Sequence, residues 1–98
     1  MTILEASLAV PPPIVYPTDM PTVLRVKGYR FFFFVADGYE PPHIHVARED
    51  RAAKFWLDPI EVARNEGLRK SEVLEASGIV RENIELLNEA WFRQFGRL

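Results

Sequence analysis

The sequence predicts a small α+β protein, in which a four-stranded, mainly antiparallel sheet is followed by two C-terminal helices in the order ββββαα. Between residues 23 and 57, apolar and polar residues alternate with the two-residue period of strands, in segments separated by turn-forming residues. After residue 58, apolar residues recur every three or four positions, which is typical of amphipathic helices. Strands followed by helices favour one sheet with helices packed on one of its faces.

We expect a proline-rich N-terminal extension, residues 1–19, and a single α+β domain, residues 20–98. The extension contains Pro11, Pro12, Pro13 and Pro17, which favour an extended conformation and cannot donate ladder hydrogen bonds. A length of 98 residues allows one domain and no more.

The composition argues against several classes of protein. The sequence has no cysteine, so it forms no disulfide and no thiolate site. No apolar run approaches the roughly 20 residues that cross a bilayer, and residues 1–19 lack the Lys or Arg of a secretory leader. We therefore expect a cytoplasmic protein without membrane contact. The formal net charge of −2 argues against a strongly basic nucleic-acid binder, although residues 20–57 are mildly basic.

Four strands are expected, at residues 23–26, 29–35, 43–48 and 52–57. Lys27-Gly28 predicts a tight turn between the first two strands, because Gly tolerates a positive φ. A loop over residues 36–42, closed by two prolines, and a turn over residues 49–51 separate the other strands.

Two helices are expected after the strands. The run Asp58-Pro59-Ile60-Glu61 predicts the start of the first, with Asp as N-cap, Pro at the first helical position and Glu three residues after the cap. This helix is expected to reach residue 65 and to stop at Gly67. Ser71 is expected to cap a second, longer helix that ends at Gly96. The apolar stripe of the longer helix consists of Val73, Val80, Ile84, Leu87, Trp91 and Phe95.

The run His43-Ile44-His45-Val46 is the most informative motif for function. Side chains alternate across a strand, so both imidazoles leave one face of the sheet while Ile44 and Val46 leave the other. His43 and His45 are the only histidines in the sequence. Since the helices should cover Ile44 and Val46, the histidines are expected on the open face, within reach of solvent. That face is expected to carry Arg25, Lys27, Arg30, Phe32, Phe34, His43, His45, Lys54 and Trp56.

These residue types suit acid–base chemistry on RNA. One imidazole can take a proton from a 2′-hydroxyl, a second can protonate the leaving oxygen, and a cation can stabilise the charge on the phosphate. The candidate catalytic residues are therefore His43, His45, Lys54 and Arg30. The candidate ligand-binding residues, which could stack on bases or neutralise phosphates, are Arg25, Phe32, Trp56 and Arg48.

Two other interpretations of the histidines stay open. The rings could bind one metal ion, but a zinc site needs three or four protein ligands, and Glu40, Glu49 or Asp58 would have to complete it. No metal and no cofactor is therefore predicted. The rings could equally fill a half-buried sheet surface and form only local hydrogen bonds. For the phenylalanines at positions 31–34, burial on both faces of a central strand is a simpler explanation than base stacking.

Several segments together resemble a bacterial family named domain of unknown function 4160. They are Met20-Pro21-Thr22-Val23-Leu24-Arg25, Gly28-Tyr29-Arg30-Phe31-Phe32-Phe33, Pro41-Pro42-His43-Ile44-His45-Val46, Ala53-Lys54-Phe55-Trp56-Leu57-Asp58-Pro59 and Glu89-Ala90-Trp91. The resemblance implies a small α+β protein in a toxin–antitoxin-like or mobile-element setting. It also implies a co-encoded small partner from the family named domain of unknown function 2442. It implies no established activity and no catalytic residues.

Two functions follow as hypotheses. The first is a module of a toxin–antitoxin-like pair that binds RNA or another anionic ligand on the histidine face. Whether it also cleaves RNA as a ribonuclease stays open at the level of the sequence. The alternative is a non-catalytic interaction protein that acts through oligomerisation or partner docking. An uncharged Phe-rich strand needs a cover, which the second helix, the proline-rich extension, a second copy or a partner protein could supply. A homo-oligomer is expected.

Overall fold

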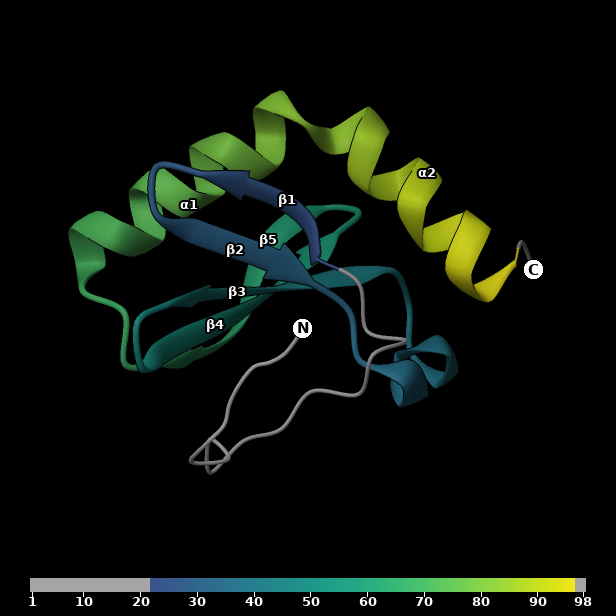
Figure 1. Cartoon of the computed structure of the whole chain (residues 1–98), viewed down its shortest axis with the longest axis horizontal. Helices are drawn as coiled ribbons and strands as arrows, with labels where there is room; N and C mark the ends of the chain where they lie inside the picture. Colours follow the sequence, from purple (N-terminus) through teal and green to yellow (C-terminus); the bar gives the residue numbers. More distant parts are fainter. Residues whose placement is uncertain (1–21, 97–98) are drawn as a thin grey trace, which may run out of the picture.

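The computed structural model describes residues 22–96, which form a five-stranded antiparallel sheet followed by two helices (Figure 1). The α+β class and the two C-terminal helices are confirmed, whereas the sheet has five strands instead of four. The proline-rich extension predicted for residues 1–19 lies outside the described residues.

The strands pair in sequence order, each antiparallel to the next. The turn predicted at Lys27 and Gly28 is confirmed, with φ of 53° and 83°, which suits the tight connection of a hairpin. The strands are β1 (Thr22–Val26), β2 (Tyr29–Phe32), β3 (His43–Arg48), β4 (Arg51–Leu57) and β5 (Ile60–Glu66).

β2 ends at Phe32, three residues earlier than predicted, and the chain then forms the 3₁₀ helix η1 (Val35–Tyr39). The cause is local hydrogen bonding. The backbone N–H of Phe34 donates to Oδ2 of Asp37 at 2.7 Å, and the N–H of Asp37 donates to the carbonyl of Phe34 at 3.0 Å. An Asp side chain that bonds nearby backbone offers the chain an alternative to the sheet ladder.

The helix predicted from Asp58 to residue 65 is wrong, because this segment forms β5. Asp58–Pro59 is a cis peptide bond at the turn, and Leu57 and Ile60 are the first paired residues of the β4–β5 hairpin. The β-branched residues Ile60 and Val62 suit a strand. Pairing along β4 also satisfies backbone groups that a short isolated helix would leave open.

The single long helix predicted from Ser71 is instead two, α1 (Lys70–Glu82) and α2 (Ile84–Phe95). Asn83 makes the break, because its side-chain amide donates to the carbonyl of Ile79 at 2.8 Å and ends α1. Arg69, not Ser71, is the N-cap of α1, with the carboxylate of Glu72 accepting its backbone N–H at 2.8 Å. Gly96, with φ of 82°, ends α2 as predicted.

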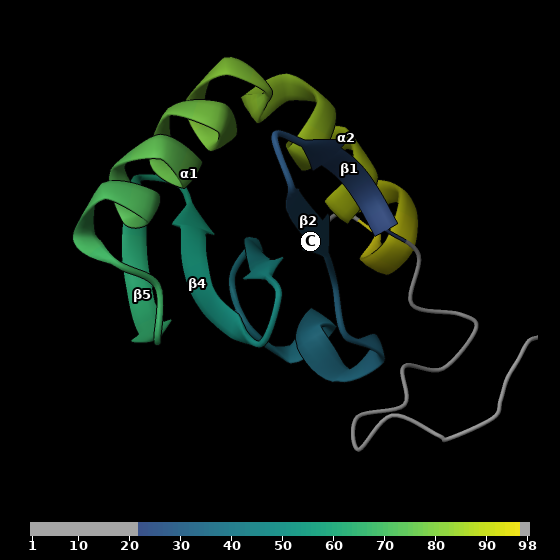
Figure 2. The ribbon, with the colours of Figure 1, turned by 60° about the vertical axis from the view of Figure 1, so that its left-hand side comes forward.

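Both helices lie on the same side of the sheet, along which they run one after the other (Figures 1 and 2). The predicted orientation of β3 and β4 is confirmed, because Ile44, Val46, Phe55 and Leu57 are all buried in the core beneath the helices. None of the described helices is long and apolar enough to cross a membrane. The remaining buried core residues are Tyr29, Phe31, Phe33, Ala53, Leu68, Ala76, Ile79, Val80, Leu87 and Trp91.

Candidate functional site

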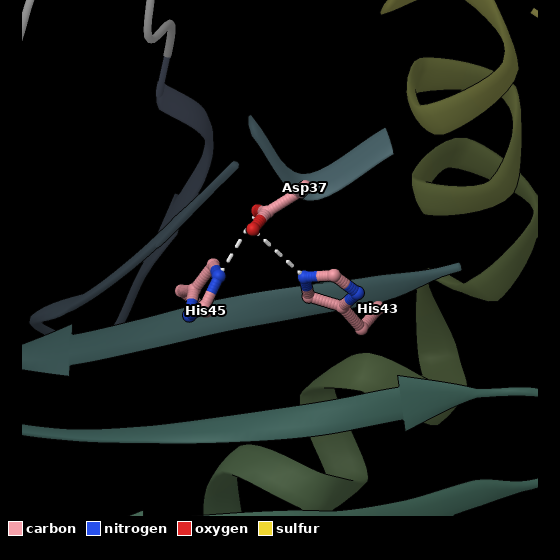
Figure 3. A group of neighbouring side chains, drawn as sticks. All are labelled: Asp37, His43 and His45. Atoms are coloured by element: carbon pink, nitrogen blue, oxygen red, sulfur yellow. Dashed lines mark hydrogen bonds and ion pairs between the residues drawn. The ribbon is translucent and has the colours of Figure 1, made fainter. Parts of the chain in front are cut away.

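Two histidines of β3 and one aspartate of η1 come together beside the sheet (Figure 3). Nε2 of His45 lies 3.0 Å from Oδ2 of Asp37, and Nε2 of His43 lies 3.1 Å from Oδ1 of the same carboxylate. The η1 turn fixes Asp37 here, because the carboxylate also accepts the N–H of Phe34. We call Asp37, His43 and His45 the histidine cluster.

The cluster is buried, which corrects the expectation that both imidazoles are open to solvent. His43 is 0% exposed and His45 is 9% exposed. The centroid of the His43 ring lies 5.0 Å from that of Trp91 and 5.7 Å from that of Trp56, so α2 and β4 both contribute to its enclosure. The two-residue period correctly places both histidines on one face, with ring centroids 5.0 Å apart.

The hydrogen bonds of His43 fix the position of its proton. Nδ1 lies 2.9 Å from the carbonyl oxygen of Pro41, which can only accept, so Nδ1 carries the hydrogen and donates it. Nε2 lies within ion-pair distance of Asp37, but the direction is not that of a hydrogen bond. This buried Nε2 consequently has no hydrogen-bond partner among the described residues.

The environment of Asp37 favours the ionised form of its carboxyl. Burial on its own raises the pKa of this carboxyl, but polar contacts with His43 and His45 and the hydrogen bond from Phe34 together outweigh burial. They hold the pKa of Asp37 well below its usual range. The cluster therefore favours a carboxylate in contact with both imidazoles.

Aromatic rings surround the exposed edge of the cluster. Phe32 is the Cα partner of His45, and their rings stack with centroids 5.6 Å apart. Phe34 meets the same imidazole edge-on at 4.5 Å and is 36% exposed. Trp56 is the Cα partner of His43 on β4. Sequence-predicted Phe32 and Trp56 thus both lie beside the cluster.

Lys54 is the cation nearest to the histidines in the sheet, as the Cα partner of His45. Its Nζ pairs with the carboxylate of Glu40 and lies 4.7 Å from the centroid of the Trp56 ring. The hydrogen bond from Lys54 lowers the pKa of Glu40. Lys54 is therefore held in place next to the cluster by a carboxylate and an aromatic ring.

A family model described as "Domain of unknown function (DUF4160)" matches residues 28–92. The chain belongs to this family. The resemblance inferred from the sequence motifs is thereby confirmed, and the matched region includes the whole histidine cluster and Trp91. No curated protein and no solved structure gives a significant match.

In this DUF4160 domain, Arg30 and Arg25 lie on strands that are further from the cluster. Arg30 of β2 donates a 2.8 Å hydrogen bond from Nε to Oγ1 of Thr22, and its guanidinium lies 4.4 Å from the centroid of the Phe32 ring. Arg25 of β1 is exposed and is the Cα partner of Arg30. The two arginines are therefore neighbours of the site, one and two strands away from β3.

Arg48 is not brought to the cluster. Its guanidinium lies 4.7 Å from the centroid of the Tyr29 ring, donates to the carbonyl of Lys27 at 3.0 Å and approaches Glu72 of α1 at 3.7 Å. Side chains alternate across β3, so Arg48 leaves the face opposite to that of His43 and His45. This is the helix side of the sheet. Of the candidate residues, Arg48 is the one that the structure separates from the others.

Sequence reasoning missed Asp37 and Arg64 in the DUF4160 domain. Asp37 lies in a segment that was expected to be a loop, so no periodicity indicated which way its side chain points. The signal that could have found it is the Asp37-Gly38 pair, which is typical of a turn that folds back over its strand. Arg64 is the Cα partner of Lys54 on β5, and it was missed because that segment was predicted to be helical.

Proposed function

We propose that the protein is the RNA-cleaving member of a toxin–antitoxin-like pair and that the histidine cluster is its reacting centre. One observation supports this most directly. His45, whose Nε2 lies 3.0 Å from the ionised Asp37, occupies a row of the sheet between an aromatic ring, Phe32, and a cation, Lys54. An imidazole paired with a carboxylate is suited to proton transfer, and rings beside cations suit single-stranded RNA.

In this proposal, residues around the cluster bind the RNA strand. The rings of Phe34, which is 36% exposed, and of the partly buried Trp56 are the proposed surfaces for base stacking. Arg30 and Arg25 on the neighbouring strands, with Lys54 beside the cluster, neutralise phosphates. The proposed ligand therefore lies across β1 to β4, on the face opposite the main core.

In the proposed reaction, the 2′-oxygen of a ribose attacks the adjacent phosphorus, and the bond from phosphorus to the 5′-oxygen of the next nucleotide breaks. The cluster takes the proton of the 2′-hydroxyl, and water supplies a proton to the departing 5′-oxygen. His45 is the ring that reaches the RNA, because His43 is completely buried. His43 is then a positioning residue, and Lys54 stabilises the charge that develops on the phosphate oxygens.

The partner in this proposal is a second small protein that covers the RNA-binding face. The family resemblance implies a co-encoded protein of the family named domain of unknown function 2442, and we propose that it is the antitoxin. Expression of the chain alone should arrest growth, and co-expression of that partner should relieve the arrest. Growth arrest that is unchanged by the partner would contradict this pairing.

RNA binding is tested by fluorescence anisotropy with a labelled single-stranded RNA at several salt concentrations. Lys54→Ala and Arg30→Ala should each weaken binding and reduce the slope of log affinity against log salt by about 1. Arg81→Ala, an exposed arginine on α1, is the matched control and should leave the slope unchanged. Equal slopes in all four proteins would mean that RNA does not occupy this face.

Cleavage is tested separately with His45→Asn. This variant should bind the RNA within about twofold of the wild-type affinity but should lose cleavage, since an amide cannot take the proton. Circular dichroism of both proteins controls for folding. A variant that cleaves at the wild-type rate would remove His45 from the reaction.

A docking role through a second copy of the chain is the second candidate, and one observation favours it. A groove of about 440 Å³ lies between β1 and α2, next to the outer edge of β1. Leu86 lines this groove and is 45% exposed. Leu86→Glu should shift the sedimentation coefficient towards that of a monomer, whereas Leu74→Glu on α1, 65% exposed and outside the groove, should not. A wild-type monomer would end this candidate.

A further inference from the structure

We infer that Asp37, His43 and His45 form a binding site for one divalent transition-metal ion. The ligand atoms would be Nε2 of His43, Nε2 of His45 and a carboxylate oxygen of Asp37 (Figure 3). These atoms all lie within 4.8 Å of one another. Three features of the cluster support this site: the nitrogen-to-oxygen spacings, the proton position on His43, and a buried nitrogen without a hydrogen bond.

The nitrogen-to-oxygen spacings of the cluster match those of a coordination shell. Bonds of about 2.0–2.1 Å at tetrahedral or octahedral angles place neighbouring ligand atoms about 2.9–3.4 Å apart. The two nitrogen-to-oxygen distances are 3.0 Å for His45 and 3.1 Å for His43. Both distances fall inside that range, although they reach different oxygens of Asp37. The two nitrogens lie within 4.8 Å of each other, so small movements of the rings would bring all three residues onto one ion.

The proton on His43 is placed as in a metal-binding histidine. Nδ1 donates its hydrogen to the carbonyl of Pro41 at 2.9 Å, and a carboxylate oxygen of Glu40 lies 3.7 Å from the same nitrogen. Such a bond fixes the tautomer and leaves the Nε2 lone pair available for a metal. The backbone before β3 therefore orients the ring for coordination through Nε2.

The Nε2 atom of His43 is buried beside a carboxylate without a hydrogen bond. It is completely buried, lacks a hydrogen-bond partner among the described residues, and lies 3.1 Å from a carboxylate oxygen. Two lone-pair-bearing atoms at that distance repel each other unless a positive charge lies between them. A proton on Nε2, which would make the ring a cation paired with Asp37, is the alternative to a metal ion, and the Zn²⁺ titration below distinguishes the two. A bound cation satisfies both atoms together.

The ligand set selects the kind of ion. Two imidazoles with one carboxylate suit Zn²⁺, Fe²⁺ or Co²⁺, whereas Mg²⁺ and Ca²⁺ prefer oxygen ligands and Cu⁺ prefers sulfur. Three protein ligands leave a coordination position open, as in catalytic metal sites. What the ion does for RNA rests on the proposed function. With its Nε2 on the ion, His45 would hold the metal instead of taking the 2′-proton, and the ion would supply a Lewis acid and a bound water at the more exposed side of the cluster.

The test uses the full chain without an affinity tag, because a histidine tag binds the same metals. Zn²⁺ is titrated into ¹⁵N-labelled wild-type protein while NMR follows the imidazole nitrogens. We expect one equivalent to shift Nε2 of both histidines and to leave the Nδ1–H of His43 in place. Nε2 signals that do not move after one equivalent would overturn the site, and this measurement needs no variant that might misfold.

A matched pair of variants then tests the carboxylate. Asp37→Asn should weaken Zn²⁺ binding at least about tenfold by calorimetry. Asp50→Asn, the same substitution at a side chain that is 95% exposed in the β3–β4 turn, should leave the affinity unchanged. Equal affinities for Asp37→Asn and wild type would remove Asp37 from the site.

The outcomes separate this inference from the proposed function, since metal binding is measured without RNA. Zn²⁺ binding to the cluster together with an absence of RNA binding would leave the metal site standing and remove the ribonuclease proposal. A second outcome is that RNA is still cleaved in the presence of a chelator and that the imidazole signals do not shift with Zn²⁺. This result would remove the metal site and leave the ribonuclease proposal standing.

Discussion

The carboxylate of Asp37 joins a backbone turn to two imidazoles. Oδ2 accepts the N–H of Phe34 and lies 3.0 Å from Nε2 of His45, while Oδ1 lies 3.1 Å from Nε2 of His43. Because these contacts come from three different positions in the chain, the carboxylate connects the end of β2, η1 and β3. The geometry of the site therefore depends on a loop residue as much as on the strand that carries the histidines.

At the residue scale, the clearest pH dependence belongs to Glu72 at the start of α1. Its carboxylate pairs with the guanidinium of Arg51 and accepts the backbone N–H of Arg69, and these contacts lower its pKa to about 2. A carboxyl with a lowered pKa stabilises the fold above its unfolded value of 4.5 and loses that contribution as the pH falls towards 2. Glu72→Gln should therefore have a lower urea midpoint than wild type at pH 7.

The same prediction fixes how the difference changes with pH. The gap between the two urea midpoints should narrow between about pH 4.5 and about pH 2, because wild-type Glu72 becomes protonated there. Glu85→Gln, at an exposed position on α2, is the control and should follow the wild-type curve. A gap that stays constant over this range would show that the Glu72 charge does not stabilise the fold.

The sequence predicts the strand residues of the site better than its loop residue. Alternation places His43 and His45 on one face and brings Trp56 and Lys54 next to them, as the β3–β4 register confirms. Alternation says nothing about Asp37, whose position follows from hydrogen bonds in a turn. It also cannot indicate that Trp91, far along the chain, packs against His43, because that contact depends on how α2 lies on the sheet.

At the element scale, the segment after β4 shows why local signals can favour the wrong structure. Asp58-Pro59 starts helices and turns equally well, because Asp caps both and Pro fixes φ in both. Only the neighbouring strand distinguishes them, since the edge of β4 offers paired hydrogen bonds over the length of β5. The same limit applies to Asn83, whose side chain divides a continuous helical pattern by bonding to Ile79.

The contact between η1 and α2 gives a prediction about the element that carries Asp37. A Cβ added at Gly38 would lie 2.7 Å from Cδ1 of Phe95, which is too close, so η1 or the ring must shift. Gly38→Ala should lower the free energy of unfolding by about 1 kcal/mol, as overpacking does, and should move the NMR signals of both imidazoles. Urea unfolding and the imidazole spectrum measure the two effects.

A double-mutant cycle identifies the cause. If the clash with Phe95 is responsible, Gly38→Ala should cost less in a Phe95→Ala background than in the wild type. Gly78→Ala is the control. A Cβ at this position in the interior of α1 meets no atom within 4 Å, and Ala favours a helix more than Gly does, so this substitution should stabilise the protein by about 0.5–1 kcal/mol. A Gly38→Ala cost that is identical in both backgrounds would mean that η1 does not depend on this contact.

At the scale of the whole molecule, the Phe-rich segment is covered by the chain's own fold. Phe31 and Phe33 lie in the core, and Phe32 is 2% exposed on the opposite face, where it stacks on His45. Only Phe34, at 36%, is substantially exposed within this run. A second copy is therefore not needed to shield these rings, and the expected homo-oligomer stays a prediction that depends on the groove beside β1.

The core connects every layer of the molecule. Buried residues of β2, β3 and β4 pack in one cluster with residues of α1 and α2, and no second cluster separates the helices from the sheet within residues 22–96. Trp56 on β4 and Trp91 on α2 report on the two layers. A single cluster of this kind favours cooperative unfolding in which both layers lose structure together.

The prediction is that single-tryptophan variants, Trp56→Phe and Trp91→Phe, each show one urea transition whose fluorescence midpoint coincides with that from circular dichroism. Phe55, which is 0% exposed, supports both layers. Phe55→Ala should cost about 3–5 kcal/mol of the roughly 5–15 kcal/mol available and should move both reporters equally. Tyr39→Ala, at a position that is 96% exposed, should leave the urea midpoints of both tryptophan reporters unchanged. If Trp91 reported unfolding at a lower urea concentration than the circular dichroism, α2 would detach separately, and the enclosure of His43 would be lost before the sheet unfolds.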